Sequence, residues 1–210
     1  MRMRRKKNLL PRMENCSHIW IKDPTAQKGI WLQGAPQDSL HLEIGCGKGT
    51  FTAQTAKNHP NTRIIAIERE QNVLLLAMEK TVQLEIPNIL FIDGDARFLR
   101  DYFTPGEVSR IYLNFSDPWP GSRHAKRRLT APTFLDIYKE ILSEKGEIHL
   151  KTDNVPLFDY SLETLEAAGF TLIEMSRNLH ENGVQGVMTD YEAKFHGLGQ
   201  AICRVVAIKN

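Results

Sequence analysis

A chain of 210 residues corresponds to one domain with room for a short appended arm, and its 41% hydrophobic and 25% charged residues exclude a chain that is disordered throughout. The formal net charge of +2 does not by itself indicate a nucleic-acid partner, so the distribution of the charges matters more than their sum. No apolar run approaches the roughly 18 to 20 residues of a membrane span, and no apolar segment follows the basic start. We therefore expect neither a membrane helix nor a secretory signal.

The three cysteines, Cys16, Cys46 and Cys203, are widely separated. Their number and spacing match neither a zinc site nor a disulfide framework. This usage favours a reducing, cytoplasmic compartment, and we expect no bound metal ion.

The first part of the chain differs in composition from the rest. Its start holds the basic residues Arg2, Arg4, Arg5, Lys6 and Lys7. Several prolines and glycines follow, together with the large apolar side chains of Trp20 and Trp31. We expect a basic N-terminal arm over residues 1–35 that docks in part on a domain formed by residues 36–210.

The predicted domain alternates short apolar runs with longer helical patterns. Strands are predicted at 40–44, 63–67, 89–92, 110–115 and 146–151, and helices at 50–58, 70–84, 132–143 and 155–168. This alternation indicates parallel βαβ units in an α/β fold. The last two predicted strands, 170–176 and 201–208, are joined by a long loop, and we expect them to close the sheet antiparallel.

The sequence LEIGCGKGT, residues 42–50, contains the end of the first predicted strand and the loop that follows it. In a doubly wound fold this loop faces the cofactor, and glycine permits a close approach of the backbone. Gly45, Gly47 and Gly49 follow a G-x-G-x-G spacing rather than the G-x-G-x-x-G that is usual for nicotinamide dinucleotides. The carboxylate of Glu43 repels a pyrophosphate and attracts a cation, which favours the sulfonium donor S-adenosylmethionine over NAD.

Further acids follow the next two predicted strands. Glu68 ends the second strand, where a carboxylate can accept both hydroxyl groups of a ribose, although NAD sites use the same device. Asp93 and Asp95 follow the third strand, where an acid can bind an adenine amino group. Taken singly, the glycines also fit a plain tight turn and Glu68 fits a solvated side chain. Cys46 has no histidine nearby and is not expected to be a nucleophile.

The fourth predicted strand leads into NFSDPWPGSRHAKRRL, residues 114–129. Two prolines stiffen the turn, so we expect Asp117 to face the cofactor cleft and Trp119 to flank a flat ring. A basic loop follows, formed by Arg123, His124, Lys126, Arg127 and Arg128. The alternative for the Asp117 segment is an ordinary Asp-Pro turn, and the alternative for the basic loop is a solvated charged face that binds nothing. Because the charges lie beside a predicted active site, they favour RNA or DNA as the substrate.

Together these segments resemble the bacterial tRNA (guanine-N7-)-methyltransferase family. The matching stretches are LEIGCGKG, AIE, GDA, FSDPWP with its basic loop, LKTDN and TDYE, in this order. The resemblance implies a Rossmann-like class I methyltransferase fold with a seven-stranded, mostly parallel sheet and helices on both faces. It also implies transfer of a methyl group from S-adenosylmethionine to N7 of guanine 46 in the variable loop of tRNA. The chain is then expected to work as a monomer or homodimer that binds tRNA and no membrane.

The resemblance also implies a role for each matching residue. Cofactor contacts are implied for Glu43, Gly45, Gly47, Gly49, Glu68, Asp95 and Asp117, and Asp117 is also the implied catalytic residue. Substrate contacts are implied for Asp153, Thr189, Asp190, Tyr191 and Glu192. RNA contacts are implied for Arg123, His124, Lys126, Arg127 and Arg128. The family usually has a lysine after DPWP, where this chain has Gly121, so we expect Arg123 or Lys126 to replace that contact.

Guanine N7 carries a lone pair and no proton, so its methylation needs no general base. Positive charge moves onto the ring, and the carboxylates of Asp117, Asp153 and Glu192 are expected to stabilise it, with contacts from Thr189 and Tyr191. We expect the base to be extruded from the folded tRNA. The glycine spacing disfavours a dehydrogenase, the lack of a second proline directly after the first disfavours an adenine amino-methyltransferase, and the intact acids disfavour a non-catalytic RNA-binding protein. Another RNA or DNA base remains the alternative target.

Overall fold

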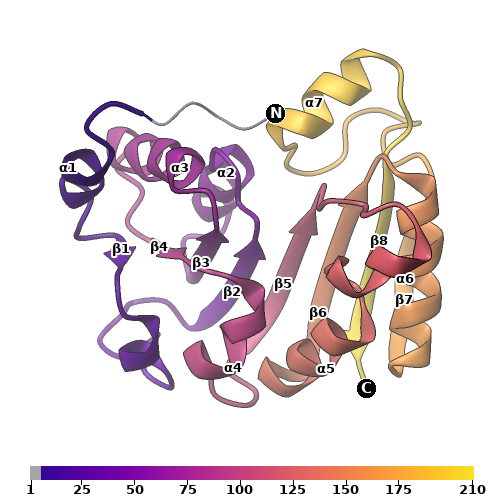
Figure 1. The fold of residues 1–210 in the computed structure, drawn as a ribbon, viewed down its shortest axis with the longest axis horizontal. Coiled ribbons are helices and arrows are strands. Elements are labelled where there is room, and N and C mark those ends of the chain that lie inside the picture. The colour runs from indigo at the N-terminus through magenta and orange to yellow at the C-terminus, as the bar shows by residue number, and fades with distance from the viewer. Residues whose placement is uncertain (1–5) are drawn as a thin grey trace. The chain divides into compact units, whose positions relative to one another are not determined.

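The structure is a computed structural model that describes residues 6–210, so Arg2, Arg4 and Arg5 of the expected basic arm lie outside the described residues. The chain divides into two units, Met1–Phe103 and Thr104–Asn210, which are described here one after the other (Figure 1). The described residues contain eight strands, four in each unit, which alternate with helices as expected for an α/β fold.

Four parallel strands form the sheet of the first unit, in the order β1-β4-β3-β2. They are β1 (Trp20–Ile21), β2 (Ser39–Ile44), β3 (Thr62–Glu68) and β4 (Ile89–Asp93). Helix α2 (Thr50–Asn58) connects β2 to β3, and helix α3 (Gln71–Gln83) connects β3 to β4. The unit ends with the short helices η2 (Ala96–Phe98) and α4 (Leu99–Tyr102). In β3, Ile64 to Ile67 are at most 2% exposed, as expected for a parallel strand that is covered on both faces.

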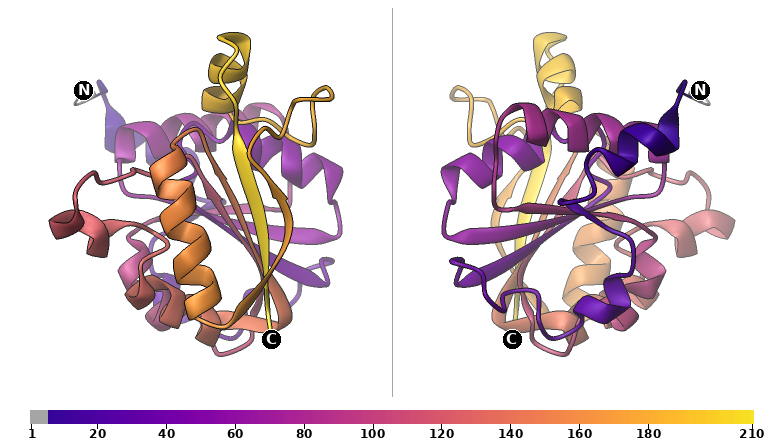
Figure 2. Two further views of the ribbon diagram at one scale, coloured as in Figure 1. Left: turned by 90° about the vertical axis from the view of Figure 1, so that its right-hand side faces the viewer. Right: turned by 90° about the vertical axis from the view of Figure 1, so that its left-hand side faces the viewer.

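Residues 6–35 contribute three short elements to the first unit: α1 (Leu9–Glu14), β1 and the 3-10 helix η1 (Pro24–Gln27). Leu9 and Met13 of α1 are buried in the same hydrophobic cluster as Leu74 and Met78 of α3, and Figure 2 shows α1 beside α3. Trp31 is 1% exposed, and its indole Nε1 donates a 2.9 Å hydrogen bond to the carbonyl oxygen of Tyr102. A few buried side chains of this segment, such as Leu9, Met13 and Trp31, therefore anchor it to the core of the first unit, while most of its residues are exposed or half-buried.

The second unit has a mixed sheet in the order β5-β6-β8-β7. Its strands are β5 (Val108–Asn114), β6 (Leu142–Thr152), β7 (Phe170–Ser176) and β8 (Cys203–Lys209). Strand β5 is parallel to β6, whereas β8 runs antiparallel to both β6 and β7. Helix α5 (Pro132–Ile141) precedes β6, and helix α6 (Val155–Ala167) packs against β7 and β8 (Figure 2, left). The antiparallel pairing predicted for the last two strands is confirmed.

The structure corrects the expected strand count from seven to eight. The additional strand is β1, whose two residues are too few to produce a readable pattern. The sequence also did not predict helix α7 (Asp190–Gly197), because its eight residues hold few apolar side chains. No helix among residues 6–210 combines the length and the apolar character that crossing a membrane requires.

Candidate active site

The glycine-rich loop joins β2 to α2 in the first unit. Gly45, Gly47 and Gly49 have φ angles of 79°, 58° and 72°, in the left-handed region that favours glycine. A Cβ atom at Gly49 would lie 2.7 Å from the Cβ atom of Ala77 in α3. By contrast, a Cβ atom at Gly45 or Gly47 would meet nothing within 4 Å. Gly49 therefore permits the close packing of two helices, whereas the other two glycines leave the backbone of the loop accessible.

Glu43 lies at the end of β2 and is only 2% exposed. Its Oε2 atom accepts a 2.5 Å hydrogen bond from the hydroxyl group of Thr52 in α2. Burial, with the nearby charges of Glu43 and Glu68, raises the pKa of the Cys46 thiol well above its ordinary value. The thiol stays protonated at neutral pH, which agrees with the prediction that Cys46 is not a nucleophile.

Glu68, at the end of β3, ties this strand to the glycine-rich loop. Its Oε2 atom accepts a 3.2 Å hydrogen bond from the backbone N–H of Gly47. Its Oε1 atom accepts hydrogen bonds of 2.8 Å and 3.0 Å from the backbone N–H groups of Arg69 and Glu70. These bonds fix the orientation of the carboxylate, and Oε2, which accepts a single bond, still has a lone pair for a further donor.

Asp95 follows β4 and forms ion pairs with two arginines. Its Oδ2 atom lies 3.0 Å from the guanidinium group of Arg97 and 3.5 Å from that of Arg69. Burial alone would raise the pKa of Asp95, but the hydrogen bonds and charge of Arg97, with the charge of Arg69, outweigh it and hold the pKa below its usual value. Asp95 is therefore an ionised acceptor at neutral pH. The nearby Asp93 accepts a 2.6 Å hydrogen bond from Gln71.

In the second unit, the turn after β5 has a strained backbone. Phe115 and Trp119 have φ angles of 51° and 41°, although neither residue is glycine. Such conformations cost about 1 to 3 kcal/mol each and cluster at functional sites, where the surroundings hold them in place. Asp117 lies between these two residues, and its side chain is exposed. This strained turn (Phe115–Pro120) therefore presents a carboxylate to solvent.

The basic loop contains the 3-10 helix η3 (Ser122–Arg127), and Arg123, Lys126 and Arg127 are exposed. The guanidinium group of Arg127 lies 4.8 Å from the centre of the Trp119 ring. His124 is half-buried and accepts a 3.0 Å hydrogen bond at Nε2 from Nε of Arg123. Arg128 directly follows η3, and its guanidinium group donates hydrogen bonds to backbone carbonyl groups of the strained turn.

Asp153 comes directly after β6, and its side chain is exposed. The neighbouring residue caps the following helix: Oδ1 of Asn154 accepts a 2.9 Å hydrogen bond from the backbone N–H of Leu157. Asn154 is therefore the N-cap of α6, and Asp153 is not needed for that task.

The segment TDYE forms the start of α7, and its four residues have different environments. Thr189 and Glu192 make a capping box, in which the hydroxyl group accepts from the Glu192 N–H at 2.9 Å and the carboxylate accepts from the Thr189 N–H at 3.1 Å. Asp190 is exposed, and Tyr191 is 62% exposed with its ring 6.3 Å from that of Phe115. Asp190 and Tyr191 are therefore the residues that this segment offers to a ligand.

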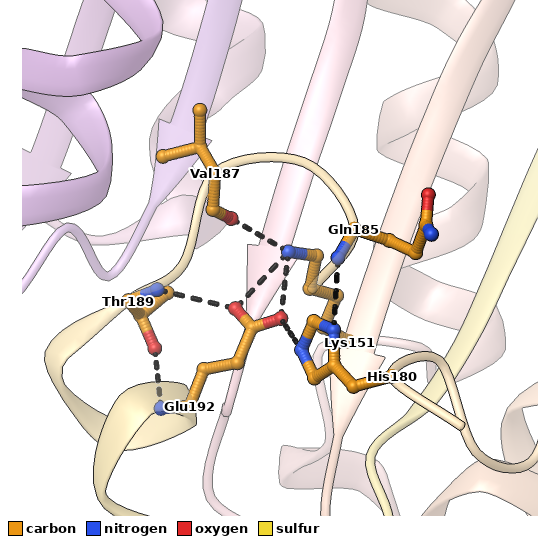
Figure 3. Close-up of polar contacts among 6 residues, drawn as sticks. All are labelled: Lys151, His180, Gln185, Val187, Thr189 and Glu192. Carbon is orange, nitrogen blue, oxygen red and sulfur yellow. Dashed lines mark hydrogen bonds and ion pairs between the residues drawn. The ribbon is translucent and has the colours of Figure 1, made fainter. Parts of the chain in front are cut away.

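Glu192 has no exposed surface and is the centre of a buried polar cluster, the Lys151–His180–Glu192 cluster (Figure 3). Nζ of Lys151 lies 2.9 Å and 3.0 Å from the two carboxylate oxygens of Glu192, and it donates a 2.8 Å hydrogen bond to the carbonyl oxygen of Val187. Nδ1 of His180 accepts a 3.1 Å hydrogen bond from the N–H of Gln185, so Nε2 carries the proton and donates to Glu192 at 2.9 Å. The carboxylate expected to contact substrate is thus already bonded within the protein.

Sequence reasoning missed several partners of the predicted site residues. Thr52, Arg97, Lys151 and His180 each hold one of the predicted acids. Thr52, Lys151 and His180 are distant from their acids in the sequence, whereas Arg97 is only two residues from Asp95, but an arginine beside an acid is too common to indicate an ion pair. The start of α7 was also missed, although Thr-x-x-Glu, the signature of a capping box, is the local pattern that indicates it.

Comparison with known proteins identifies the family of this chain. A family model described as a putative methyltransferase matches residues 37–205. The tRNA (guanine-N(7)-)-methyltransferase of Exiguobacterium sibiricum is 46% identical over 209 residues, which cover 99% of this chain and 98% of the relative. The chain belongs to the tRNA (guanine-N(7)-)-methyltransferase family. The family predicted from the sequence is thereby confirmed.

Solved structures with low sequence identity share the fold of this family member. The 16S rRNA methyltransferase KamB aligns with a TM-score of 0.65 at 16% identity and covers 83% of this chain and 89% of its own. A SAM-dependent methyltransferase from Aquifex aeolicus aligns with a TM-score of 0.58 at 14% identity and covers 98% of this chain and 100% of its own. The class I methyltransferase fold is therefore also confirmed.

Proposed function

We propose that the chain transfers a methyl group from S-adenosylmethionine to N7 of the guanine at position 46 of tRNA, giving 7-methylguanosine and S-adenosylhomocysteine. The observation that carries the proposal is the 46% identity, over nearly the full length of both chains, to a protein named for this activity on tRNA guanine N7. The DPWP turn with its basic loop supports it, because this segment distinguishes the family from other methyltransferases. The reaction takes place where tRNA is found, in the cytoplasm.

The first unit supplies the residues that fit the methyl donor. S-adenosylmethionine, when bound, supplies an electrophilic methyl group on a sulfonium centre. Gly45 and Gly47 leave the loop backbone accessible, and the buried carboxylate of Glu43 gives the loop a negative potential that suits a cation. The Glu68 carboxylate is oriented by three backbone N–H groups and suits the hydroxyl groups of a ribose. The ionised Asp95 suits the adenine amino group.

The second unit supplies the residues that fit guanine. The exposed carboxylates of Asp117, Asp153 and Asp190 accept hydrogen bonds from the N1–H and amino groups of the base and leave N7 free to react. Asp117 is the catalytic residue, because its negative charge stabilises the positive charge that develops on the ring. The exposed ring of Tyr191 offers a surface on which an extruded base stacks. Thr189 and Glu192 support this segment through the capping box.

The basic loop supplies the contacts to the RNA backbone. Arg123, Lys126 and Arg127 are exposed and carry fixed positive charges, and His124 lies beside them. Contacts of this kind to phosphates provide affinity that falls steeply with salt.

The test is incubation of the purified chain with labelled S-adenosylmethionine and an unmodified tRNA transcript, followed by mass-spectrometric location of the methyl group. We expect 7-methylguanosine at position 46 and no transfer to a transcript that carries adenosine there. Substitution Asp117→Asn keeps the shape of the side chain and removes its charge, so we expect kcat to fall by about 100-fold or more. The matched control is Asp101→Asn, an exposed acid in α4 that should keep full activity. A methyl group on another base, or full activity of Asp117→Asn, contradicts the proposal.

A further inference from the structure

Arg128 differs from the other arginines of the basic loop in where its guanidinium group points. Nε donates a 3.1 Å hydrogen bond to the carbonyl oxygen of Pro118, and Nη2 donates a 3.3 Å hydrogen bond to the carbonyl oxygen of Trp119. The guanidinium carbon lies 4.3 Å from the centre of the Tyr160 ring in α6. The side chain is half-buried, whereas those of Arg123 and Arg127 are exposed. Two of its nitrogens, Nε and Nη2, and one face of its plane are thus engaged by the protein itself.

The carbonyl groups that Arg128 holds belong to the strained turn around Asp117. Pro118 and Trp119 directly follow Asp117, and Trp119 has a φ angle of 41°. A non-glycine residue keeps such a backbone conformation only where its surroundings enforce it. The N-terminal side of the turn is fixed in a similar way, because the backbone N–H of Phe115 donates a 2.8 Å hydrogen bond to the carbonyl oxygen of Lys151. Asp117 therefore lies between two anchors, of which Arg128 is the one on the C-terminal side.

The chemistry of arginine fits this anchor better than that of any other residue. A planar guanidinium group donates to two carbonyl oxygens in one plane and presents its face to an aromatic ring at the same time. Lysine carries the same charge, but its ammonium group has neither several donors in one plane nor a flat face that can stack on a ring. A phosphate ligand, by contrast, needs an accessible guanidinium group, and Arg127 is exposed, although its guanidinium group also lies near the Trp119 ring.

We propose that Arg128 is a positioning residue for Asp117, which holds the strained turn through the Pro118 and Trp119 carbonyl groups, and that it is not a ligand of RNA phosphates. The inference rests on the proposed function, in which Asp117 acts on the reacting base. It divides the basic loop into exposed cations that bind RNA and one arginine that orients the catalytic turn.

The test compares Arg128→Gln with Arg127→Gln, which removes the same charge one residue away. The dissociation constant for tRNA is measured at several salt concentrations with S-adenosylhomocysteine present, so that no reaction occurs, and kcat is measured separately. For Arg128→Gln we expect kcat to fall about 10- to 100-fold, as for a catalytic group displaced by about 1 Å, with the salt slope of tRNA binding unchanged. For Arg127→Gln we expect weaker tRNA binding and a salt slope reduced by about 0.7 to 0.9, the loss of one phosphate contact.

Arg128→Lys gives a second, independent reading. It keeps the charge, so a phosphate ligand would retain most of its binding energy and the variant would be active. A positioning role predicts that kcat stays low in Arg128→Lys. The inference is overturned if Arg128→Lys is fully active, or if Arg128→Gln lowers the salt slope as Arg127→Gln does while kcat is retained.

Hydrogen–deuterium exchange separates this inference from the proposed function. We expect the backbone amides of residues 115–121 to exchange faster in Arg128→Gln than in Arg127→Gln, whether or not tRNA is the substrate. Equal exchange in both variants contradicts the role of Arg128 as an anchor, whereas a wild-type chain that does not methylate guanine 46 contradicts the proposed function alone.

If Arg128→Gln does not fold, Tyr160→Leu removes the ring under the guanidinium group and is expected to lower kcat with the salt slope of tRNA binding unchanged. Full activity of that variant overturns the inference.

Discussion

The acidic residues of the predicted site differ in burial, and the buried and the exposed ones have different roles. Glu43 and Glu192 are at most 2% exposed, and each is hydrogen-bonded to side chains of the protein. Asp117 and Asp153 are exposed after the ends of β5 and β6. Buried acids in such networks orient their neighbours, whereas exposed acids at strand ends are available to a ligand. The residue type alone therefore does not predict the role.

Gly49 tests the steric part of the glycine-rich loop. In Gly49→Ala the new Cβ atom would lie 2.7 Å from the Cβ atom of Ala77, and the φ angle of 72° would be strained. We expect the free energy of unfolding to fall by about 2 to 3 kcal/mol, from overpacking plus backbone strain, as measured by chemical denaturation.

Two variants control the effect of Gly49→Ala. Gly47→Ala has nothing within 4 Å of its Cβ atom and should show only the backbone strain, about 1 to 2 kcal/mol. Gly49→Ala combined with Ala77→Gly removes the clash and should regain part of the lost stability. An equal loss in the single and double variants would show that the contact with Ala77 does not matter.

At the scale of elements, the Lys151–His180–Glu192 cluster joins three parts of the second unit: the end of β6, the loop after β7 and the start of α7. It holds the segment that carries Asp190 and Tyr191. Because α7 has few apolar side chains of its own, we infer that its position depends on these polar contacts.

Lys151→Met tests this dependence. The change leaves the Glu192 carboxylate buried without its cation, so we expect the free energy of unfolding to fall by about 3 to 5 kcal/mol. Replacing the pair together, by Lys151→Met with Glu192→Leu, removes the uncompensated charge and should recover much of that loss. Thermal and chemical denaturation of the three proteins measure both effects. If Lys151→Met costs less than about 1 kcal/mol, the cluster is not holding this segment.

The elements that the sequence predicted well are those with a strong apolar pattern. The buried run Ile64–Ile67 of β3 and the antiparallel β8 were both found from such patterns. Strand β1 and helix α7 were missed, because the first has two residues and the second is held by the buried Glu192 rather than by an apolar face. The candidate site residues were predicted from residue type, spacing and the family resemblance, but the strain at Phe115 and Trp119 is a property of the backbone that the residue types do not reveal.

At the scale of the whole molecule, the net charge of +2 conceals an uneven distribution. The exposed cations of the basic loop lie on the chain near an exposed acid, Asp117, for which we propose the catalytic role. Their pattern, rather than the sum, indicates a polyanionic substrate. The response of stability to pH likewise depends on individual groups rather than on the net charge, because one buried titratable group can dominate it.

His149 in β6 is such a group. Burial lowers the pKa of His149 to about 4, assisted by the charges of Arg110 and Arg204 and opposed by the hydrogen bond and charge of Glu147. The ordinary pKa of histidine is about 6.5, so between these values the unfolded chain binds a proton that the folded chain does not. Lowering the pH therefore favours the unfolded state. We expect His149 to reduce the free energy of unfolding by about 1.4 kcal/mol per pH unit as the pH falls from about 6.5 to about 4.

The comparison that isolates this contribution is His149→Gln, whose amide group can still donate a hydrogen bond to Glu147. Chemical denaturation of both proteins at pH 7, 6 and 5 should give curves that converge as the pH falls, because the variant lacks the titrating group. The lowered pKa of Glu147 has little effect on this comparison, since a carboxylate whose pKa is lowered from 4.5 loses its stabilising effect as the pH falls below about 4.5, outside the range of pH 5 to 7. Parallel stability curves for the two proteins would mean that His149 takes up its proton equally easily in the folded and the unfolded chain, and the buried, neutral state assigned to it would be wrong.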